Sequence, residues 1–121
     1  MGKKTLVIGA STNPNRYSYM AINKLIDNQH AVVAYGLKKG EVRGVEIKND
    51  IRLIDRDIDT VTLYIGPQNQ PDYYSFIRTL KPKRVIFNPG TVNQGFMKDL
   101  EQEGIEVVEA CTLVLLSTGL Y

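Results

Sequence analysis

The sequence predicts an α/β fold of the Rossmann type, a doubly wound, five-stranded parallel sheet with helices on both faces, in one domain over residues 1–121. Two observations predict it. Short apolar runs rich in β-branched residues recur along the chain, and stretches with helical spacing of apolar residues separate them. Because strands that are joined through helices lie parallel in right-handed crossovers, this alternation indicates a parallel sheet.

The first strand is expected at residues 5–8, a β-branched run that ends at Gly9 and is typical of a strand buried on both faces. A helix then begins near residues 15–17 and runs to about Asn28, with one apolar stripe. The other expected strands cover residues 31–35, 60–65, 84–87 and 105–108. The other expected helices cover residues 73–80, 95–104 and 111–116, with a short helical turn near 51–54.

Residues 37–46 show no periodicity and are rich in glycine and charged side chains. This composition is typical of a loop. We therefore expect a functional loop here, after the second strand.

Composition narrows the function classes. The formal net charge is +2, from 15 basic and 13 acidic residues, so we expect no nucleic-acid partner. Cys111 is the single cysteine, the start of the chain lacks an apolar signal segment, and no apolar run approaches the ~20 residues that cross a bilayer. We expect a cytoplasmic protein that is not inserted in a membrane.

Four glycine-containing loops follow the carboxyl ends of the expected strands, at residues 9–16, 36–44, 66–70 and 88–94. In open parallel sheets, ligands bind at this end, where the strand order reverses. Glycine lets the backbone approach a ligand closely, although it also serves simply to turn the chain.

The first loop favours an anionic ligand. It opens with Gly9 and Ala10, continues with three short polar residues, Ser11 to Asn13, and reaches Arg16 where the helix begins. The unpaired N–H groups of a helix start attract phosphate, and a guanidinium can bind phosphate through two hydrogen bonds. The alternative is that the polar residues, Thr12 among them, only cap the helix.

The loop lacks the G-x-G-x-x-G pattern of nicotinamide sites, and the second strand ends at Gly36 without the acidic residue that binds a ribose diol. Lys38 and Lys39 follow instead. Two lysines would attract a phosphate on the ribose, which fits coenzyme A and NADP alike. A solvated lysine pair is the alternative.

A series of short motifs follows the expected strands in a fixed order: Gly9-Ala10-Ser11, Asn13-Pro14, Arg16, Lys38-Lys39-Gly40 with Gly44, Ile65-Gly66-Pro67, Asn88-Pro89-Gly90-Thr91-Val92-Asn93, and residues 103–111. In these motifs, which extend over nearly the whole chain, the sequence resembles the CoA-binding domain family, Rossmann-like proteins similar to the amino-terminal domain of the succinyl-CoA synthetase alpha subunit. The chain departs from the family at Tyr35-Gly36-Leu37, where Asn-Pro is usual, and within the fourth loop, where an aromatic residue and Gln often precede the glycine and this chain has Asn88-Pro89.

The resemblance implies that the first loop holds the diphosphate of coenzyme A, that Lys38 or Lys39 binds its 3′-phosphate, and that Pro67 borders the adenine or the pantetheine. The residues expected to bind the cofactor are Gly9, Ala10, Ser11, Thr12, Asn13, Arg16, Tyr17, Gly36, Lys38, Lys39, Pro67 and Gly90. Tyrosines more often fill the core or the surface, but Tyr17 or Tyr35 is a candidate to stack on adenine.

We expect no catalysis and no metal site. His30, the only histidine, falls at the opposite end of the sheet, and Cys111 is either a buried inert thiol or a group that reaches the cleft. The expected function is therefore a non-catalytic protein that binds coenzyme A or acyl-CoA. An NADP-binding oxidoreductase domain and an interaction domain that has lost its ligand are the alternatives. The apolar tail at residues 113–120 is compatible with a homodimer as well as with a core.

Overall fold

A computed structural model describes residues 2–121. Seven strands form one sheet in the order β3-β4-β2-β1-β5-β6-β7. Their bounds are Thr5–Ile8 (β1), Val32–Tyr35 (β2), Gly40–Val42 (β3), Val45–Lys48 (β4), Thr60–Leu63 (β5), Arg84–Phe87 (β6) and Glu106–Glu109 (β7). All neighbours pair in parallel except β3 and β4. The predicted Rossmann-like class is confirmed.

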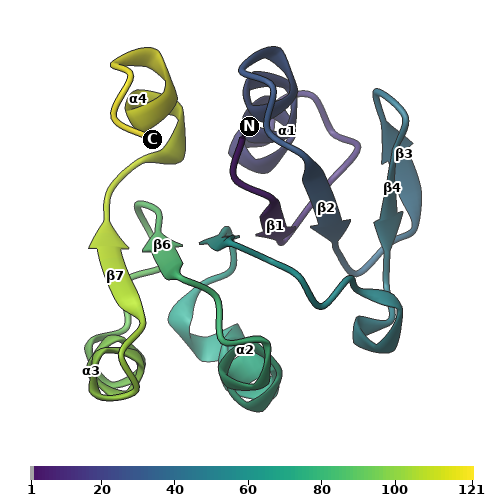
Figure 1. Cartoon of the computed structure of the whole chain (residues 1–121). Helices are drawn as coiled ribbons and strands as arrows, with labels where there is room; N and C mark the ends of the chain where they lie inside the picture. Colours follow the sequence, from purple (N-terminus) through teal and green to yellow (C-terminus); the bar gives the residue numbers. More distant parts are fainter. Residues whose placement is uncertain (1) are drawn as a thin grey trace.

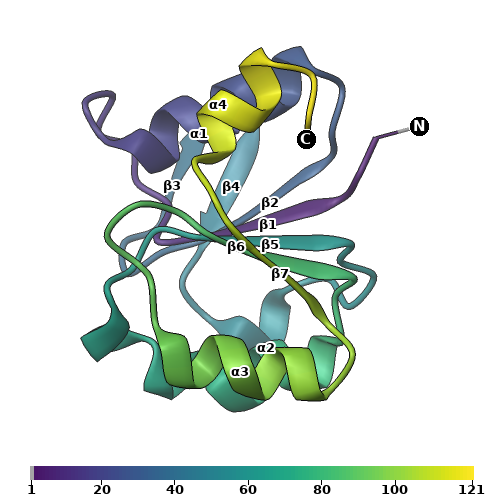
Figure 2. The same cartoon turned by 90° about the vertical axis from the view of Figure 1, so that its left-hand side faces the viewer.

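Helices cover both faces of the sheet, so the molecule has three layers (Figures 1 and 2). The helices are Tyr17–Asp27 (α1), Tyr74–Leu80 (α2), Gln94–Gln102 (α3) and Thr112–Ser117 (α4). Helices α1 and α4 lie side by side on one face, and α2 and α3 lie on the other. Three 3₁₀ turns, at Ile51–Leu53 (η1), Pro67–Asn69 (η2) and Pro71–Tyr73 (η3), complete the connections.

Alternating side chains of the strands build two apolar cores. In β1, Leu6 and Ile8 pack with the core beneath α2 and α3, whereas Val7 packs with the core beneath α1 and α4. Every residue of β1, β5 and β6 is buried. Burial on both faces explains why β-branched and apolar residues dominate these strands. The buried threonines and the arginine among them are hydrogen-bonded.

The prediction of a loop at residues 37–46 is wrong in part, because the chain forms an antiparallel hairpin there. The hairpin adds two strands, so the sheet has seven strands rather than the five predicted. Arg43 and Gly44 are the two turn residues, with φ of 50° and 84°. Two-residue hairpin turns favour such positive φ values because their twist matches that of the strands. Only Val42 and Ile47 of the hairpin are deeply buried, so the apolar signal was too short to recognise.

Candidate functional site

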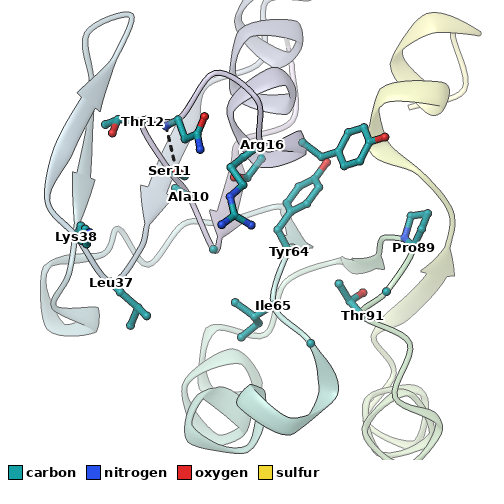
Figure 3. Close-up of a pocket in the computed structure, with 16 residues that line it drawn as sticks. Ala10, Ser11, Thr12, Arg16, Leu37, Lys38, Tyr64, Ile65, Pro89 and Thr91 are labelled. Atoms are coloured by element: carbon teal, nitrogen blue, oxygen red, sulfur yellow. Dashed lines mark hydrogen bonds between the residues drawn. The ribbon is translucent and has the colours of Figure 1, made fainter.

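The site is built around β1, the central strand at which the chain changes direction across the sheet. β1 pairs with β2 on one side and with β5 on the other, so the loops after β1 and β5 diverge. A cavity of about 660 Å³ opens at this end of the sheet (Figure 3). Its lining residues are Gly9, Ala10, Ser11, Thr12, Asn13, Arg16, Tyr17, Ser18, Leu37, Lys38, Tyr64, Ile65, Gly66, Pro89, Gly90 and Thr91.

The polar residues of the first loop shape the loop and do not cap α1. Ser11 Oγ accepts a hydrogen bond from Asn13 N at 3.0 Å, and Asn13 Oδ1 accepts one from Asn15 N at 3.0 Å. Arg16 occupies the N-cap position, and no side chain caps the helix. The capping alternative is therefore wrong. The first turn of α1 faces the cavity through Tyr17 and Ser18, and its positive dipole end favours an anion there.

Two cations line the cavity. Arg16 comes from the start of α1 and Lys38 from the loop after β2, and Figure 3 shows the Arg16 side chain directed into the space above Ile65. Both side chains are exposed, and within residues 2–121 neither forms an ion pair. No carboxylate lines this cavity among the described residues. The site therefore has uncompensated positive charge where a phosphate would bind.

Two glycines are required by the geometry at the floor of the site. Gly9 has φ of 95°, which favours glycine. A Cβ on Gly36 would lie 2.3 Å from the carbonyl oxygen of Ala10, so the loops after β1 and β2 pack together only with glycine at this position. Gly36 thus acts as a spacer, and it lines a second, smaller cavity.

The structure brings most of the predicted binding residues together. Those that line the larger cavity are Gly9, Ala10, Ser11, Thr12, Asn13, Arg16, Tyr17, Lys38 and Gly90. Lys39 and Pro67 line neither this cavity nor the smaller one. Of the two adjacent lysines, the structure therefore favours Lys38.

Sequence reasoning missed several lining residues, which are Ser18, Leu37, Tyr64, Ile65, Gly66, Pro89 and Thr91. Most of them directly follow a strand end within or beside a loop that the glycine pattern identified. A rule that takes the first residues after each expected strand would have found Gly66 and Pro89. Tyr64 and Ile65 fall inside the strand expected at residues 60–65, whereas β5 ends at Leu63, so the expected bounds hid them. Leu37 and Ser18 carry no such signal, because an exposed leucine and a helical serine are common.

Tyr64 supplies one wall of the cavity (Figure 3). Burial raises the pKa of its hydroxyl to about 12, so the side chain stays neutral near pH 7. The hydroxyl has no hydrogen-bond partner in the described part of the chain. The ring therefore contributes apolar surface rather than an ionised group.

Buried amides hold the loops beneath the cavity in place. Asn88 Nδ2 donates to Thr62 Oγ1 at 2.7 Å and to Leu63 O at 2.8 Å, and Asn88 Oδ1 accepts from Thr112 N at 2.8 Å. These bonds connect the ends of β5 and β6 to the start of α4. A fully satisfied buried polar group rigidifies its surroundings, so the lining residues after these strands sit on a fixed support.

A second amide connects the loops after β5 and β6. Gln70 is completely buried, and its Nε2 donates to Ile65 O at 3.1 Å and to Thr91 O at 2.7 Å. Asn93 Nδ2 in turn donates to Gln70 Oε1 at 3.0 Å. Ile65 and Thr91, which both line the cavity, are thereby held by the same side chain.

The remaining reactive residues lie elsewhere. His30 Nδ1 accepts a hydrogen bond from Lys3 N at 2.9 Å, before the amino ends of β1 and β2. Cys111 is half-buried at the N-cap of α4 and lines neither cavity. Within residues 2–121, His, Cys, Asp and Glu do not gather in a group that suits a metal ion, and no helix has the length and apolarity to cross a membrane.

Comparison with known proteins places this geometry in a family. The chain is similar over its full length to a crystal structure of an uncharacterised protein, with 50% identity, a TM-score of 0.95, and coverage of 100% of this chain and 99% of that one. A protein from Thermus thermophilus matches at 23% identity and TM-score 0.85, covering 98% and 91% of the two chains. A hypothetical protein from Pyrococcus horikoshii OT3 matches at 24% identity and TM-score 0.87, covering 97% and 83%.

The last two similarities concern the fold. A search of curated proteins gave no match. The model of the CoA binding domain, however, matches residues 3–117, nearly the entire chain, including all four loops at the carboxyl ends of the strands. Together with the cation-lined cavity at the switch point, this match shows that the chain belongs to the CoA-binding domain family.

Proposed function

We propose that the larger cavity binds coenzyme A or an acyl-CoA, and that the chain acts without catalysis of its own, as a carrier, sensor or accessory subunit. The observation that carries the proposal is the cavity at the switch point, which joins a helix start, Arg16 and Lys38 around one space without a carboxylate in the described residues. Its volume of about 660 Å³ falls within the ~300–1,000 Å³ of small-molecule sites.

The position of each cation supports a division of roles. Arg16 lies at the start of α1, where a helix dipole also attracts charge, so we assign it to the diphosphate. Lys38 follows the end of β2, where dinucleotide sites bind the ribose, so we assign it to the 3′-phosphate. Lys39 has no part in this assignment.

The lining also favours binding over chemistry. Among the described residues that surround the larger cavity, none is a histidine, cysteine, aspartate or glutamate. The serine, threonine, lysine and tyrosine side chains in this lining therefore have no imidazole or carboxylate in it to activate them. We expect that the purified protein neither releases free thiol from acyl-CoA nor forms acyl-CoA from acid and nucleotide.

Titration calorimetry with coenzyme A and dephospho-CoA tests the proposal. A hydrogen bond to a charged group corresponds to about 1.5–3 kcal/mol, so dephospho-CoA should bind roughly ten- to a hundredfold more weakly. Lys38→Ala should bind both ligands about equally, since it no longer senses the group that differs between them. Lys39→Ala is the matched control and should keep the wild-type preference.

Two results would contradict the proposal. If wild type binds NAD as tightly as coenzyme A, the site is a general nucleotide site. If wild type binds both CoA forms equally, Lys38 is only a solvated lysine. A preference for NADP over coenzyme A in the same titrations would favour the oxidoreductase-type alternative.

A further inference from the structure

The two helices that cover one face of the sheet are held there in different ways. α1 buries Ala21, Ile22 and Leu25 against that face. In residues 112–121, which comprise α4 and the tail that follows it, Leu116 is the one apolar side chain that is fully buried. Burial of apolar surface is what makes a segment costly to open. The segment 112–121, here called the strap, is therefore held less firmly by apolar contact than α1.

The surface of the sheet beneath the strap is polar. Three buried side chains of the strands contact the strap there, Thr5, Thr62 and Arg84. Their neighbours in β5 and β6, Leu63 and Val85, belong to the apolar core on the opposite face. Polar groups regain hydrogen bonds to water when a covering segment leaves, whereas exposure of apolar side chains is unfavourable. This part of the sheet thus tolerates exposure.

Polar contacts fasten the strap at its two ends. At the carboxyl end of the strands, Thr112 N donates to Asn88 Oδ1 at 2.8 Å, and the hydroxyls of Thr112 and Thr62 are hydrogen-bonded at 2.8 Å. At the amino end, the Tyr121 hydroxyl is hydrogen-bonded to Thr5 Oγ1 at 2.5 Å. Because water replaces such bonds when they break, each one contributes little net stability. Loss of the contacts at one end therefore makes loss of those at the other end easier.

Two buried polar atoms have no hydrogen-bond partner within residues 2–121, Tyr64 Oη and Arg84 Nη2. Tyr64 packs against the core cluster that contains Leu116, and the guanidinium of Arg84 lies 4.2 Å from the centre of the Tyr121 ring. Both atoms are thus buried on the face that the strap covers. Unpaired buried polar groups destabilise the state that buries them, and water would satisfy them once the strap moved away. The docked state is biased toward opening.

Tyr64 and Asn88 connect the strap to the larger cavity. The Tyr64 ring lines that cavity (Figure 3), and the same side chain packs beneath the strap. Asn88, which accepts the hydrogen bond of Thr112 N, directly precedes the lining residues 89–91. Opening of the strap would remove one support of this loop. An occupied cavity and a docked strap therefore favour each other, and the effect must be reciprocal.

We propose that the strap undocks from the sheet as one unit and that a ligand in the larger cavity favours its docked state. The first half depends on the contacts of the strap alone. The second half rests on the proposed function, because it requires the cavity to hold a ligand. A protein built in this way transmits occupancy of the cavity to the opposite end of the sheet, where Tyr121 is docked. That behaviour is what a sensor requires.

Hydrogen exchange followed by mass spectrometry tests both halves. In the free protein, the amides of residues 112–121 should exchange together and about tenfold or more faster than those of α1. With coenzyme A at about ten times its dissociation constant, exchange of the strap should slow about tenfold, because a ligand that binds only the docked state reduces opening by that factor. The Leu120 amide, which donates to Leu115 O at 2.9 Å, reports this effect away from the cavity.

Variants at the tail test whether the strap opens as one unit. Tyr121→Ala should speed alkylation of Cys111, at the other end of the strap, about tenfold through loss of the aromatic and hydrogen-bond contacts. Tyr121→Phe keeps the ring and should have a smaller effect. Leu120→Ala is the matched control, since Leu120 is 71% exposed, and it should keep the wild-type rate. Circular dichroism checks that each variant is folded. Equal alkylation rates in Tyr121→Ala and Leu120→Ala would show that the two ends open independently, against the proposal.

Calorimetry with coenzyme A on the same samples separates this inference from the proposed function. If the strap and α1 exchange at the same rate in the free protein, the strap has no opening of its own and the inference is wrong. If coenzyme A binds but leaves exchange of the strap unchanged, the coupling is wrong and the proposed function stands. If coenzyme A does not bind, the proposed function fails, and the coupling fails with it.

Discussion

The two ends of the parallel strands use their cationic side chains differently. At the amino end, Lys4 Nζ lies 2.6 Å from Asp55 Oδ2 and 2.8 Å from Asp57 Oδ1, and these hydrogen bonds raise the pKa of Lys4. At the carboxyl end, Arg16 and Lys38 line a cavity without an ion pair among the described residues. Charge is compensated within the protein at one end and left for a ligand at the other.

Arg84 extends this contrast. It is buried at the amino end of β6, where its Nε donates to Thr60 Oγ1 at 2.9 Å and its guanidinium lies 4.2 Å from the centre of the Tyr121 ring. Such a cation contributes to packing and is closed to a ligand. A cation in this fold therefore indicates a binding site when it is both unpaired and directed into a cavity.

The polar groups under the cavity provide the first way to sharpen this comparison. We expect Asn88→Ala to lower the free energy of unfolding by about 2–4 kcal/mol, because it removes three hydrogen bonds and leaves buried groups unpaired. Urea unfolding followed by circular dichroism measures the change. Asn28→Ala is the control at the other end of the sheet, where the side chain makes one exposed hydrogen bond, and it should cost less than about 1 kcal/mol. Equal losses of unfolding free energy in the two variants would show that the buried hydrogen bonds of Asn88 stabilise the protein no more than the exposed one of Asn28.

Removing one cation from each end of the sheet gives the next largest effect. Arg16→Ala should weaken coenzyme A and dephospho-CoA by similar factors, roughly ten- to a hundredfold, since it faces the diphosphate that both share. It should leave the thermal midpoint unchanged. Lys4→Ala should do the reverse, with a slightly lower midpoint and unchanged affinity, because exposed ion pairs contribute little stability and Lys4 is far from the ligand. Loss of affinity in Lys4→Ala would contradict the division between the two ends.

His30 gives the smallest expected effect. Burial, together with the nearby charges of Lys3 and Arg84, lowers the pKa of His30 below its ordinary value of 6.5. As the pH falls through that value, the unfolded chain binds a proton before the folded protein does, so stability decreases and then levels off below the folded-state pKa.

Urea unfolding at about pH 7.5 and about pH 5.5 should therefore show a larger loss of stability for wild type than for His30→Gln. Glutamine keeps an acceptor for the Lys3 N–H but does not titrate. An identical pH dependence in both proteins would show that His30 does not contribute. The affinity for coenzyme A, measured for both proteins at the same pH, should be equal.

Much of the fold was predictable from local sequence. Runs rich in β-branched and apolar residues at 5–8, 60–65 and 84–87 identified β1, β5 and β6, although β5 ends at Leu63. These strands are buried on both faces, where nearly every side chain must be apolar or hydrogen-bonded. The hairpin at residues 40–48 was not predicted because it lies at the edge of the sheet. Edge strands bury few side chains, so their sequence has little apolar pattern to recognise.

The same contrast applies to the site. Glycine and polar residues after each strand identified the loops that form the larger cavity, because the carboxyl ends of parallel strands meet at one edge of the sheet. The sequence by itself could not separate Lys38 from Lys39. That distinction depends on which of the two side chains shares a space with Arg16. Tertiary packing alone decides that, since the strand order and the close approach of Gly36 to Ala10 are properties of segments far apart in the chain.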